Sequence, residues 1–402
     1  MATPREQLDT IARVSSEIVP EEELLVRLEE SARTGRPLRV KYGMDPTAPD
    51  IHLGNAVALH KIRIFQELGH HAVLIIGDAT AMVGDPSGQD ETRPMLTEAA
   101  VRAHAATYLD QVGHIVDLDE AEIRYNREWF APMSFDAVLQ LLARMTVARM
   151  LERDSFAKRH AAGQPIGIHE LVYCLMQGHD SVEVESDVEL GGTDQKFNLM
   201  VGRELQRQAG QRPQVCVLHP LLEGTDGQRK MSKSLGNAIG ITDEPGEMYG
   251  KIMSLPDEMM AKYFTYAAFT PAAEAERWLA GHPKEAKDAL AKAVVRLYHD
   301  AAAAKAASAE FDRVHRHHEL PDEIPDVVVP ASELGEGGTI WIVKLIVLAG
   351  FAGSNGEARR LVEGGGVSLD GATIAEPGDV AITGGEVLKV GKRRFARLQR
   401  GT

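Results

Sequence analysis

Apolar runs of strand length alternate with segments of helical periodicity through the first part of the chain. The candidate strands lie at 38–44, 71–80, 123–126, 182–192 and 214–222. Between the first two, Val57, Ile62 and Phe65 recur at helical spacing, and Gly69 ends the pattern. Residues 5–36 also read as helical. Such alternation predicts an α/β fold with a doubly wound parallel sheet, in which ligands bind beyond the carboxyl ends of the strands.

The character of the chain changes twice after this predicted sheet. Residues 243–316 have a helical pattern, 326–338 are rich in Pro and Gly and read as part of a linker, and 339–402 are short and basic. The last segment holds nine Lys/Arg and six Asp/Glu, a net charge of +3. The whole chain carries −15, so the remainder carries −18. A basic tail on an acidic body fits a localised polyanion contact, and it also fits chance.

Composition excludes several classes of protein. The chain has 402 residues, enough for two or three domains. Its longest apolar run, WIVKLIVLAGFAG, is interrupted by Lys344 and is too short to span a bilayer. The polar start and the two isolated cysteines, Cys174 and Cys216, predict a cytoplasmic protein without a structural zinc site. The cluster His315, His317 and His318 favours a solvated helix end over a metal site.

Two short stretches suggest phosphate binding. Residues 44–57, MDPTAPDIHLGNAV, place Thr47, His52 and Asn55 where a strand gives way to a helix, whose N-terminus attracts phosphate groups. An N-terminal capping sequence is the alternative. Residues 227–237, GQRKMSKSLGN, concentrate positive charge between two glycines. On its own, this could be a solvated loop.

Taken together, HLGN (52–55) and KMSKS (230–234) resemble the two signatures of the class I aminoacyl-tRNA synthetases, in the expected order. The resemblance implies ATP as a substrate, with Mg²⁺ accompanying it and no dedicated protein metal site. It implies a catalytic set of Thr47, His52, Asn55, Arg93, Lys230 and Lys233. The implied ATP contacts are Gly54, Gly192, Asp194, Met231, Ser232 and Ser234.

Three further stretches resemble the tyrosine-activating members of that family: GGTDQKFN (191–198), HELVYCLMQGHD (169–180) and GDATAMVGDPSG (77–88). The tyrosine-binding residues implied are Lys41, Asp85, Tyr173, Gln177, Asp180 and Gln195. Tyr173, Gln177 and Asp180 would share one helix face. Ordinary helix packing is the alternative, although an unpaired buried Asp would be costly.

Two positions depart from the family pattern. Lys41 stands where a tyrosine often contacts the substrate phenol, and a pairing with Asp180 is one expectation for it. In the segment 88–94, GQDETRP, Gln89 and Asp90 replace the usual basic residues. Fewer cations near the pyrophosphate would imply slower activation.

Residues 354–371 resemble the S4-type RNA-binding module that bacterial tyrosine enzymes carry at the C-terminus. The implied tRNA contacts are Arg359, Arg360, Lys392, Arg393 and Arg394. The family pattern divides the chain into a Rossmann-like catalytic domain (1–242), a helical anticodon-side domain (243–325), a linker (326–338) and the S4 domain (339–402). A helical insertion at about 130–165 would form a homodimer interface.

The resemblance thus implies a ligase that joins tyrosine to tRNA(Tyr), away from any membrane. A paralogue that activates a tyrosine analogue and an RNA-binding protein that has lost catalysis are the alternatives. A tryptophan enzyme would share the fold but would lack the S4-like tail and would not need Asp180.

Overall fold

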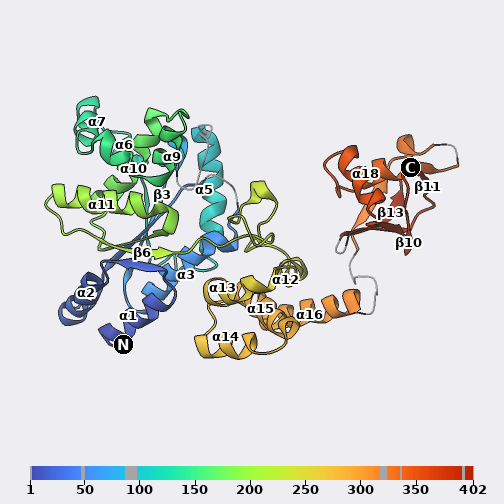
Figure 1. Cartoon of the computed structure of the whole chain (residues 1–402), viewed down its shortest axis with the longest axis horizontal. Helices are drawn as coiled ribbons and strands as arrows, with labels where there is room; N and C mark the ends of the chain where they lie inside the picture. Colours follow the sequence, from blue (N-terminus) through green and yellow to red (C-terminus); the bar gives the residue numbers. More distant parts are fainter. Residues whose placement is uncertain are drawn as a thin grey trace. The chain divides into compact units, whose positions relative to one another are not determined.

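The computed structural model describes residues 2–401 except 47–49, 87–96, 317–323, 336 and 392–393. The chain forms two compact units, Met1–Ala304 and Lys305–Thr402 (Figure 1). The predictions for Thr47, Gln89, Asp90, Arg93, His317, His318, Lys392 and Arg393 lie outside the described residues.

A six-stranded sheet forms the centre of the first unit, in the order β1-β6-β5-β2-β3-β4. Its strands are β1 (Glu17–Val19), β2 (Arg39–Met44), β3 (His71–Ile76), β4 (Glu122–Tyr125), β5 (Val188–Gly192) and β6 (Val215–His219). All neighbours pair in parallel except β1, which is antiparallel to β6. The chain passes from β2 to its neighbour β3 on one side of the sheet, and from β5 to its neighbour β6 on the other side. The strand order therefore reverses between β2 and β5. This reversal is the switch point at which such sheets bind ligands.

Helices cover both faces of this sheet. The helix α3 (Leu53–Glu67) connects β2 to β3 and α11 (Lys196–Gln208) connects β5 to β6. Because the two right-handed connections run in opposite directions, these helices lie on opposite faces. The predicted apolar stripe of α3 is buried at Val57, Ile62 and Phe65. The other helices of this region are α1 (Pro4–Arg13), α2 (Glu21–Thr34), α4 (Thr80–Val83), α5 (Glu98–Val112) and α10 (Ile168–Glu183).

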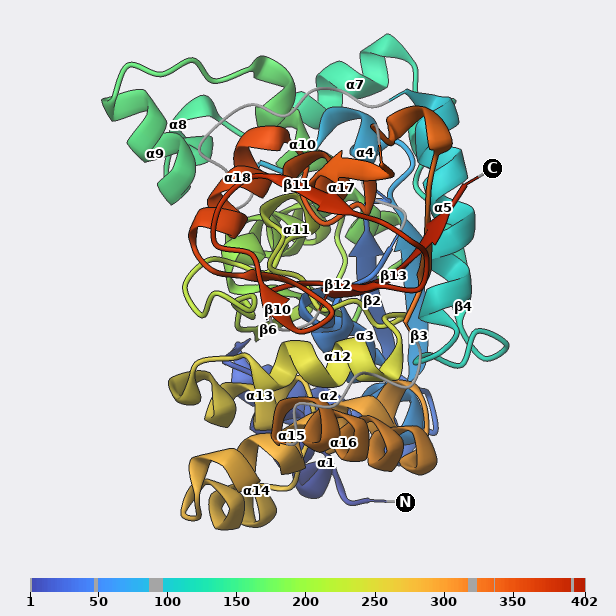
Figure 2. The same ribbon diagram turned by 90° about the vertical axis from the view of Figure 1, so that its right-hand side faces the viewer.

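Two helical regions extend from the sheet. One comprises α6 (Arg127–Phe130), α7 (Phe135–Leu142), α8 (Val147–Met150) and α9 (Asp154–Ala161). The other comprises α12 (Pro245–Met253), α13 (Met260–Tyr266), α14 (Ala272–Leu279), α15 (Pro283–Tyr298) and α16 (Ala301–Arg316), as the helical pattern of 243–316 predicts. Figures 1 and 2 show α7 and α9 at one end of the first unit and α13 to α15 at the other.

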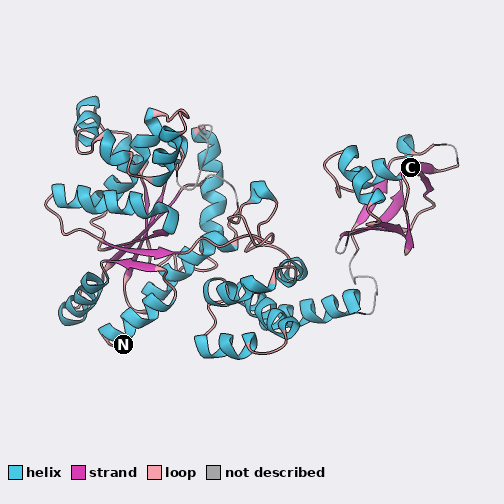
Figure 3. Cartoon of the chain, in the orientation of Figure 1, coloured by secondary structure: helices cyan, strands magenta, loops and turns pink. Residues whose placement is uncertain are grey.

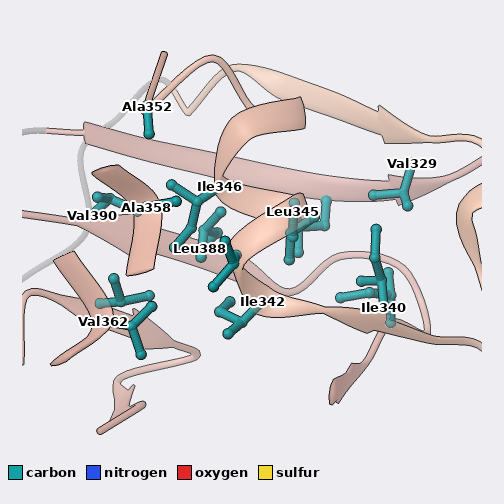
Figure 4. Packing of buried hydrophobic residues seen from close by; sticks show 14 residues of the cluster. Val329, Ile340, Ile342, Leu345, Ile346, Ala352, Ala358, Val362, Leu388 and Val390 are labelled. Carbon is teal, nitrogen blue, oxygen red and sulfur yellow. The ribbon is translucent and has the colours of Figure 1, made fainter. Parts of the chain in front are cut away.

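The second unit is a small α+β fold (Figure 3). Its five-stranded sheet has the order β10-β9-β12-β13-β7, and β11 pairs with β8. The strands are β7 (Asp326–Val329), β8 (Thr339–Trp341), β9 (Val367–Leu369), β10 (Ala372–Thr373), β11 (Asp379–Ala381), β12 (Val387–Val390) and β13 (Arg394–Arg400), with α17 (Ile342–Leu348) and α18 (Asn355–Glu363). The core joins Ile342, Leu345 and Ile346 of α17 to Val362 and Leu388 (Figure 4).

Three local expectations require correction. The predicted linker 326–338 contains β7, because that segment pairs in parallel with β13 and joins the C-terminal sheet. Within 182–192 only Val188–Gly192 is a strand, since α10 continues to Glu183 and the chain turns at Glu185 with φ of 47°. The stretch 5–36 is interrupted by β1, which pairs with β6. Among the described residues, no helix has the length and apolar character to cross a membrane.

Candidate active site

A cavity of about 720 Å³ lies at the carboxyl ends of β2, β5 and β6 in the first unit. It brings together residues that are far apart in the sequence. The predicted site residues that line it are His52, Gly54, Asn55, Asp85, Tyr173, Gly192, Asp194, Gln195, Lys230, Met231, Ser232, Lys233 and Ser234. Lys41, Gln177 and Asp180 are buried and are not among the described lining residues.

His52 is the residue just before α3, and its backbone N–H donates to Asn55 Oδ1 at 3.4 Å. Burial, followed by the charges of Lys230 and Lys233, lowers the pKa of His52 to about 4. The imidazole is therefore neutral at pH 7 and offers a hydrogen bond rather than a positive charge. A Cβ added at Gly54 would lie 3.1 Å from this ring, so glycine permits the close packing here.

The side chain of Asn237 forms hydrogen bonds that anchor the loop around KMSKS. This buried amide accepts a hydrogen bond from the Ser232 N–H at 2.8 Å and donates to Asp226 Oδ2 at 3.1 Å. Met231 is also buried, and its N–H donates to the Leu222 carbonyl at 2.9 Å. Two side chains thus anchor the loop, while both of its lysines remain partly exposed. The KMSKS motif predicts a role for Met231, as an ATP contact. It predicts none for Asn237, although Asn237 is the last residue of the quoted stretch 227–237.

The two lysines of the loop are paired with carboxylates at the rim of the cavity. Lys230 Nζ lies 2.8 Å from Asp194 Oδ2, and Lys233 forms an ion pair with Asp50. Asp194 is the predicted ribose contact, whereas Asp50 carries no prediction. An incoming polyphosphate would compete with these carboxylates for the same ammonium groups.

A carboxylate also holds Tyr173. Its hydroxyl donates to Asp45 Oδ2 at 2.9 Å, and Thr80 donates to Asp45 Oδ1 at 2.7 Å. Burial, with Asp45 and Asp85 nearby, raises the pKa of Tyr173 well above its ordinary value. The phenol therefore stays protonated. Because its hydrogen is given to Asp45, its oxygen can act only as an acceptor toward a further partner.

Asp85 is linked to the residues expected near the substrate carboxylate and ammonium. Gln195 Nε2 donates to Asp85 Oδ2 at 3.2 Å, and Gln195 Oε1 accepts from the Gly192 N–H at 3.1 Å. Asn198 Nδ2 reaches Asp85 Oδ1 at 3.5 Å and Gln177 Oε1 at 2.8 Å. Asn198 belongs to the quoted GGTDQKFN stretch, but only the structure shows that it links Asp85 to Gln177.

The predicted pairing of Lys41 with Asp180 is wrong. Lys41 Nζ lies 2.9 Å from Glu189 Oε1, on the neighbouring strand. Asp180 instead accepts hydrogen bonds from Trp129 Nε1 at 2.9 Å and Asn126 Nδ2 at 3.4 Å. Burial raises the pKa of Asp180 to about 7, even though Lys41 and these two donors act in the opposite direction.

In the second unit, Arg359 and Arg360 are exposed on α18 and Arg394 is exposed at the start of β13. The Arg359 guanidinium lies 5.7 Å from the centroid of the Trp341 ring, which can orient it. The three predicted RNA contacts that are described therefore lie on the surface of this unit.

Comparisons with known proteins agree with this arrangement. The family model described as "tRNA synthetases class I (W and Y)" matches residues 33–316. The chain is 49% identical to the tyrosine–tRNA ligase of Moorella thermoacetica, over 98% of this chain and 95% of that protein. Its identity to the tyrosine–tRNA ligase of Symbiobacterium thermophilum is 50%, over 98% and 97% of the two chains.

Solved structures show the same fold. A C-terminally truncated mitochondrial tyrosyl-tRNA synthetase of Aspergillus nidulans has a TM-score of 0.63 and 22% identity, covering 79% of this chain and 95% of that one. The tyrosyl-tRNA synthetase of Archaeoglobus fulgidus in complex with L-tyrosine has a TM-score of 0.60 and 24% identity, covering 76% and 99%.

Proposed function

The chain belongs to the class I tRNA synthetases of the tryptophan and tyrosine group, and on this basis we propose that it is a tyrosine–tRNA ligase. It activates L-tyrosine with ATP and transfers the tyrosyl group to the 3′ end of tRNA(Tyr). One observation carries the proposal beyond the family. A single cavity holds the KMSKS loop, the start of α3 and the Tyr173–Asp85–Gln195 group.

Activation requires no enzyme nucleophile. An oxygen of the tyrosine carboxylate bonds to the α-phosphorus of ATP, the bond from that phosphorus to the bridging oxygen breaks, and its electron pair leaves with pyrophosphate. Catalysis is then a matter of positioning and charge stabilisation. We assign Lys230 and Lys233 to the departing phosphates, neutral His52 to a hydrogen bond with them, and Gly192 and Asp194 to the ribose. Thr47, Asn55 and Arg93 complete this proposed set.

Tyrosine would bind with its ammonium group toward Asp85, Tyr173 and Gln177, its carboxylate toward Gln195, and its phenol toward Asp180. Mg²⁺ would arrive with ATP and offset part of the phosphate charge. Among the described residues, no group of three or more His, Cys, Asp or Glu side chains could hold a metal ion. We place the enzyme in the cytoplasm, as is usual for bacterial members of this family.

We assign tRNA binding to the second unit. Its exposed Arg359, Arg360 and Arg394, with Lys392 and Arg393, would contact phosphates of tRNA(Tyr). This contact would weaken as salt concentration rises. The helices from 243 onward would then form the anticodon-side region, which joins the catalytic part to this unit.

Amino-acid-dependent ATP–pyrophosphate exchange tests the proposed function. Exchange is expected with tyrosine and not with phenylalanine, tryptophan or 3-substituted tyrosines, and the same protein should charge tRNA(Tyr). Lys233→Ala serves as the inactive reference. Exchange only with a substituted tyrosine would identify a paralogue with another substrate. Binding of tRNA without exchange would identify an RNA-binding protein that has lost catalysis.

We further propose a homodimer formed through the predicted insertion. Large apolar side chains are exposed on its helices and at the start of α10: Phe135 at 74%, Ile168 at 80%, and also Leu139 and Val147. Exposed apolar side chains gathered in one region are typical of a protein interface.

Phe135→Glu is expected to weaken the dimer at least about 10-fold, since association would bury an unpaired charge. Analytical ultracentrifugation over a concentration series measures the dissociation constant. Leu297→Glu, at an exposed apolar position on α15, is the matched control and should remain dimeric. A Phe135→Glu protein with unchanged association would place the interface elsewhere.

A further inference from the structure

Lys41 and Glu189 form an ion pair in the interior of the first unit. They are paired residues on the adjacent strands β2 and β5, and their side chains are 0% and 1% exposed. A buried ion pair is stabilising only when hydrogen bonds also satisfy both charged groups, and an apolar pair of similar volume is often no worse. Removing both charges from water costs free energy, which raises the question of what the pair contributes besides packing.

Its hydrogen bonds are fully used. Lys41 Nζ has three donors, which go to the Gln177 carbonyl at 2.9 Å, Ser181 Oγ at 2.7 Å and Glu189 Oε1 at 2.9 Å. Glu189 Oε1 also accepts from Gln177 Nε2 at 3.1 Å, and Oε2 accepts from Ser181 Oγ at 3.2 Å and from Gln214. Both contacts to Gln177 connect the pair to the stripe of α10 that is assigned to the substrate.

These contacts decide which way the Gln177 amide faces. An ionised carboxylate only accepts hydrogen bonds, so Glu189 binds the amide NH₂ and turns the amide oxygen away from itself. That oxygen accepts from Asn198 Nδ2 at 2.8 Å, and the same nitrogen reaches Asp85 at 3.5 Å. Tyr173 is held in a similar way, because Asp45 takes its hydroxyl hydrogen. In both residues a carboxylate binds a donor hydrogen, so that the oxygen acts as an acceptor. The Gln177 oxygen already accepts from Asn198 and has a second lone pair for a cationic group.

We propose that the Lys41–Glu189 ion pair positions the amide oxygen of Gln177 as an acceptor for the substrate ammonium group. Gln177 lies one turn of α10 beyond Tyr173 and is linked through Asn198 to Asp85. Tyr173 and Asp85 do line the cavity from which the ammonium would approach. Lys41 is then a positioning residue that acts through Glu189 and Gln177, although its position in the sequence suggests contact with the phenol. The inference rests on the proposed function, since it specifies how tyrosine's ammonium is recognised.

The test compares two ligands that differ only in that group: tyrosine and 3-(4-hydroxyphenyl)propanoate, which lacks the ammonium. Their dissociation constants are measured by calorimetry for the wild type and for Lys41→Met/Glu189→Gln. The double variant is neutral, which avoids an unpaired buried charge. The amide that replaces the Glu189 carboxylate can offer either a donor or an acceptor, so the Gln177 amide is free to reverse.

The preference for tyrosine over the deamino analogue is expected to fall at least about 10-fold in the double variant, the effect of one hydrogen bond to a charged group. Binding of the analogue should change less than about 3-fold. Lys61→Met is the matched control, because it removes another buried lysine, which contacts Ser15 and the Leu218 carbonyl. The preference should be unchanged there.

Thermal unfolding of each variant separates positioning from folding. A folded double variant that keeps the wild-type preference overturns the proposal, and so does an equal loss of preference in Lys61→Met. Both results leave the proposed function intact if the wild type catalyses exchange with tyrosine. A wild-type protein that binds no tyrosine would instead overturn the proposed function, and this inference with it.

Discussion

Replacing Lys233 with alanine is expected to slow tyrosyl-adenylate formation by roughly 100- to 1000-fold, the effect of removing one preorganised group that stabilises transition-state charge. Lys233 is half-exposed at the rim of the cavity, where it forms an ion pair with Asp50. Negative charge moves onto pyrophosphate only as the bond to the α-phosphorus breaks. The ammonium group therefore contributes most in the transition state, and the affinity for tyrosine should hardly change.

Single-turnover fluorescence measures the rate, and equilibrium dialysis measures tyrosine binding. Arg229→Ala is the control within the same loop, because this exposed arginine forms its ion pair with Asp226, 2.9 Å away. Its activation rate should stay within about threefold of the wild type, as expected for an exposed ion pair. Weaker tyrosine binding in Lys233→Ala, with an unchanged rate, would contradict the role assigned to this lysine.

Asp180→Asn is expected to lower kcat/KM for tyrosine roughly 100-fold, because a buried hydrogen bond to a charged acceptor is lost. The pH profile should identify the group. With a pKa of about 7, the wild-type carboxyl is protonated at lower pH, so kcat/KM for tyrosine should rise with pH through about 7 and then level. This rise should vanish in Asp180→Asn. A profile that persists in the variant would assign the titration to another group.

The same substitution should stabilise the protein at alkaline pH. The pKa of Asp180 is raised from 3.8 to about 7 in the folded chain. Its contribution to stability is therefore fully present below about pH 4 and is lost as pH rises through 7. At pH 8 this loss amounts to about 4 kcal/mol at most, at 1.36 kcal/mol per pKa unit. Denaturant unfolding at pH 5 and pH 8 should show a smaller decline for Asp180→Asn than for the wild type.

Much of the fold could be predicted because its signals are local. The strands β3 and β6 are buried apolar runs, and α3 shows its stripe directly in the sequence. The strand β7, DVVV, has β-branched residues but is only four residues long and lies between Pro325 and Pro330, so its surroundings read as a linker. Its pairing with β13, about 70 residues away, is what makes it part of a sheet. The strand β1 has three residues, too few to interrupt a helical pattern visibly.

In the site, too, the residues of local motifs could be predicted and the long-range contacts could not. Many residues of the short motifs, from His52 to Ser234, do line one cavity, since each motif is continuous in the sequence, whereas Gln177 and Asp180 do not line it. The ion pair of Lys41 with Glu189 could not be predicted from the sequence, because it depends on the register between two strands. The two residues are 148 positions apart in the chain. Asp50 as the partner of Lys233 likewise depends on where the loop lies, which the sequence does not state.

The carboxylates at the rim of the cavity, Asp194 and Asp50, affect how strongly the enzyme would bind ATP. Asp194 and Asp50 already form ion pairs with Lys230 and Lys233. If these lysines bind the phosphates as we propose, ATP binding is an exchange of partners, and its net free energy is a small difference. On this proposal, the two lysines add little to the affinity for ATP in the ground state. We expect the phosphates to outcompete the carboxylates clearly only when charge accumulates on the leaving pyrophosphate. The lysines would then stabilise the transition state more than they stabilise bound ATP, and an interaction of that kind raises kcat.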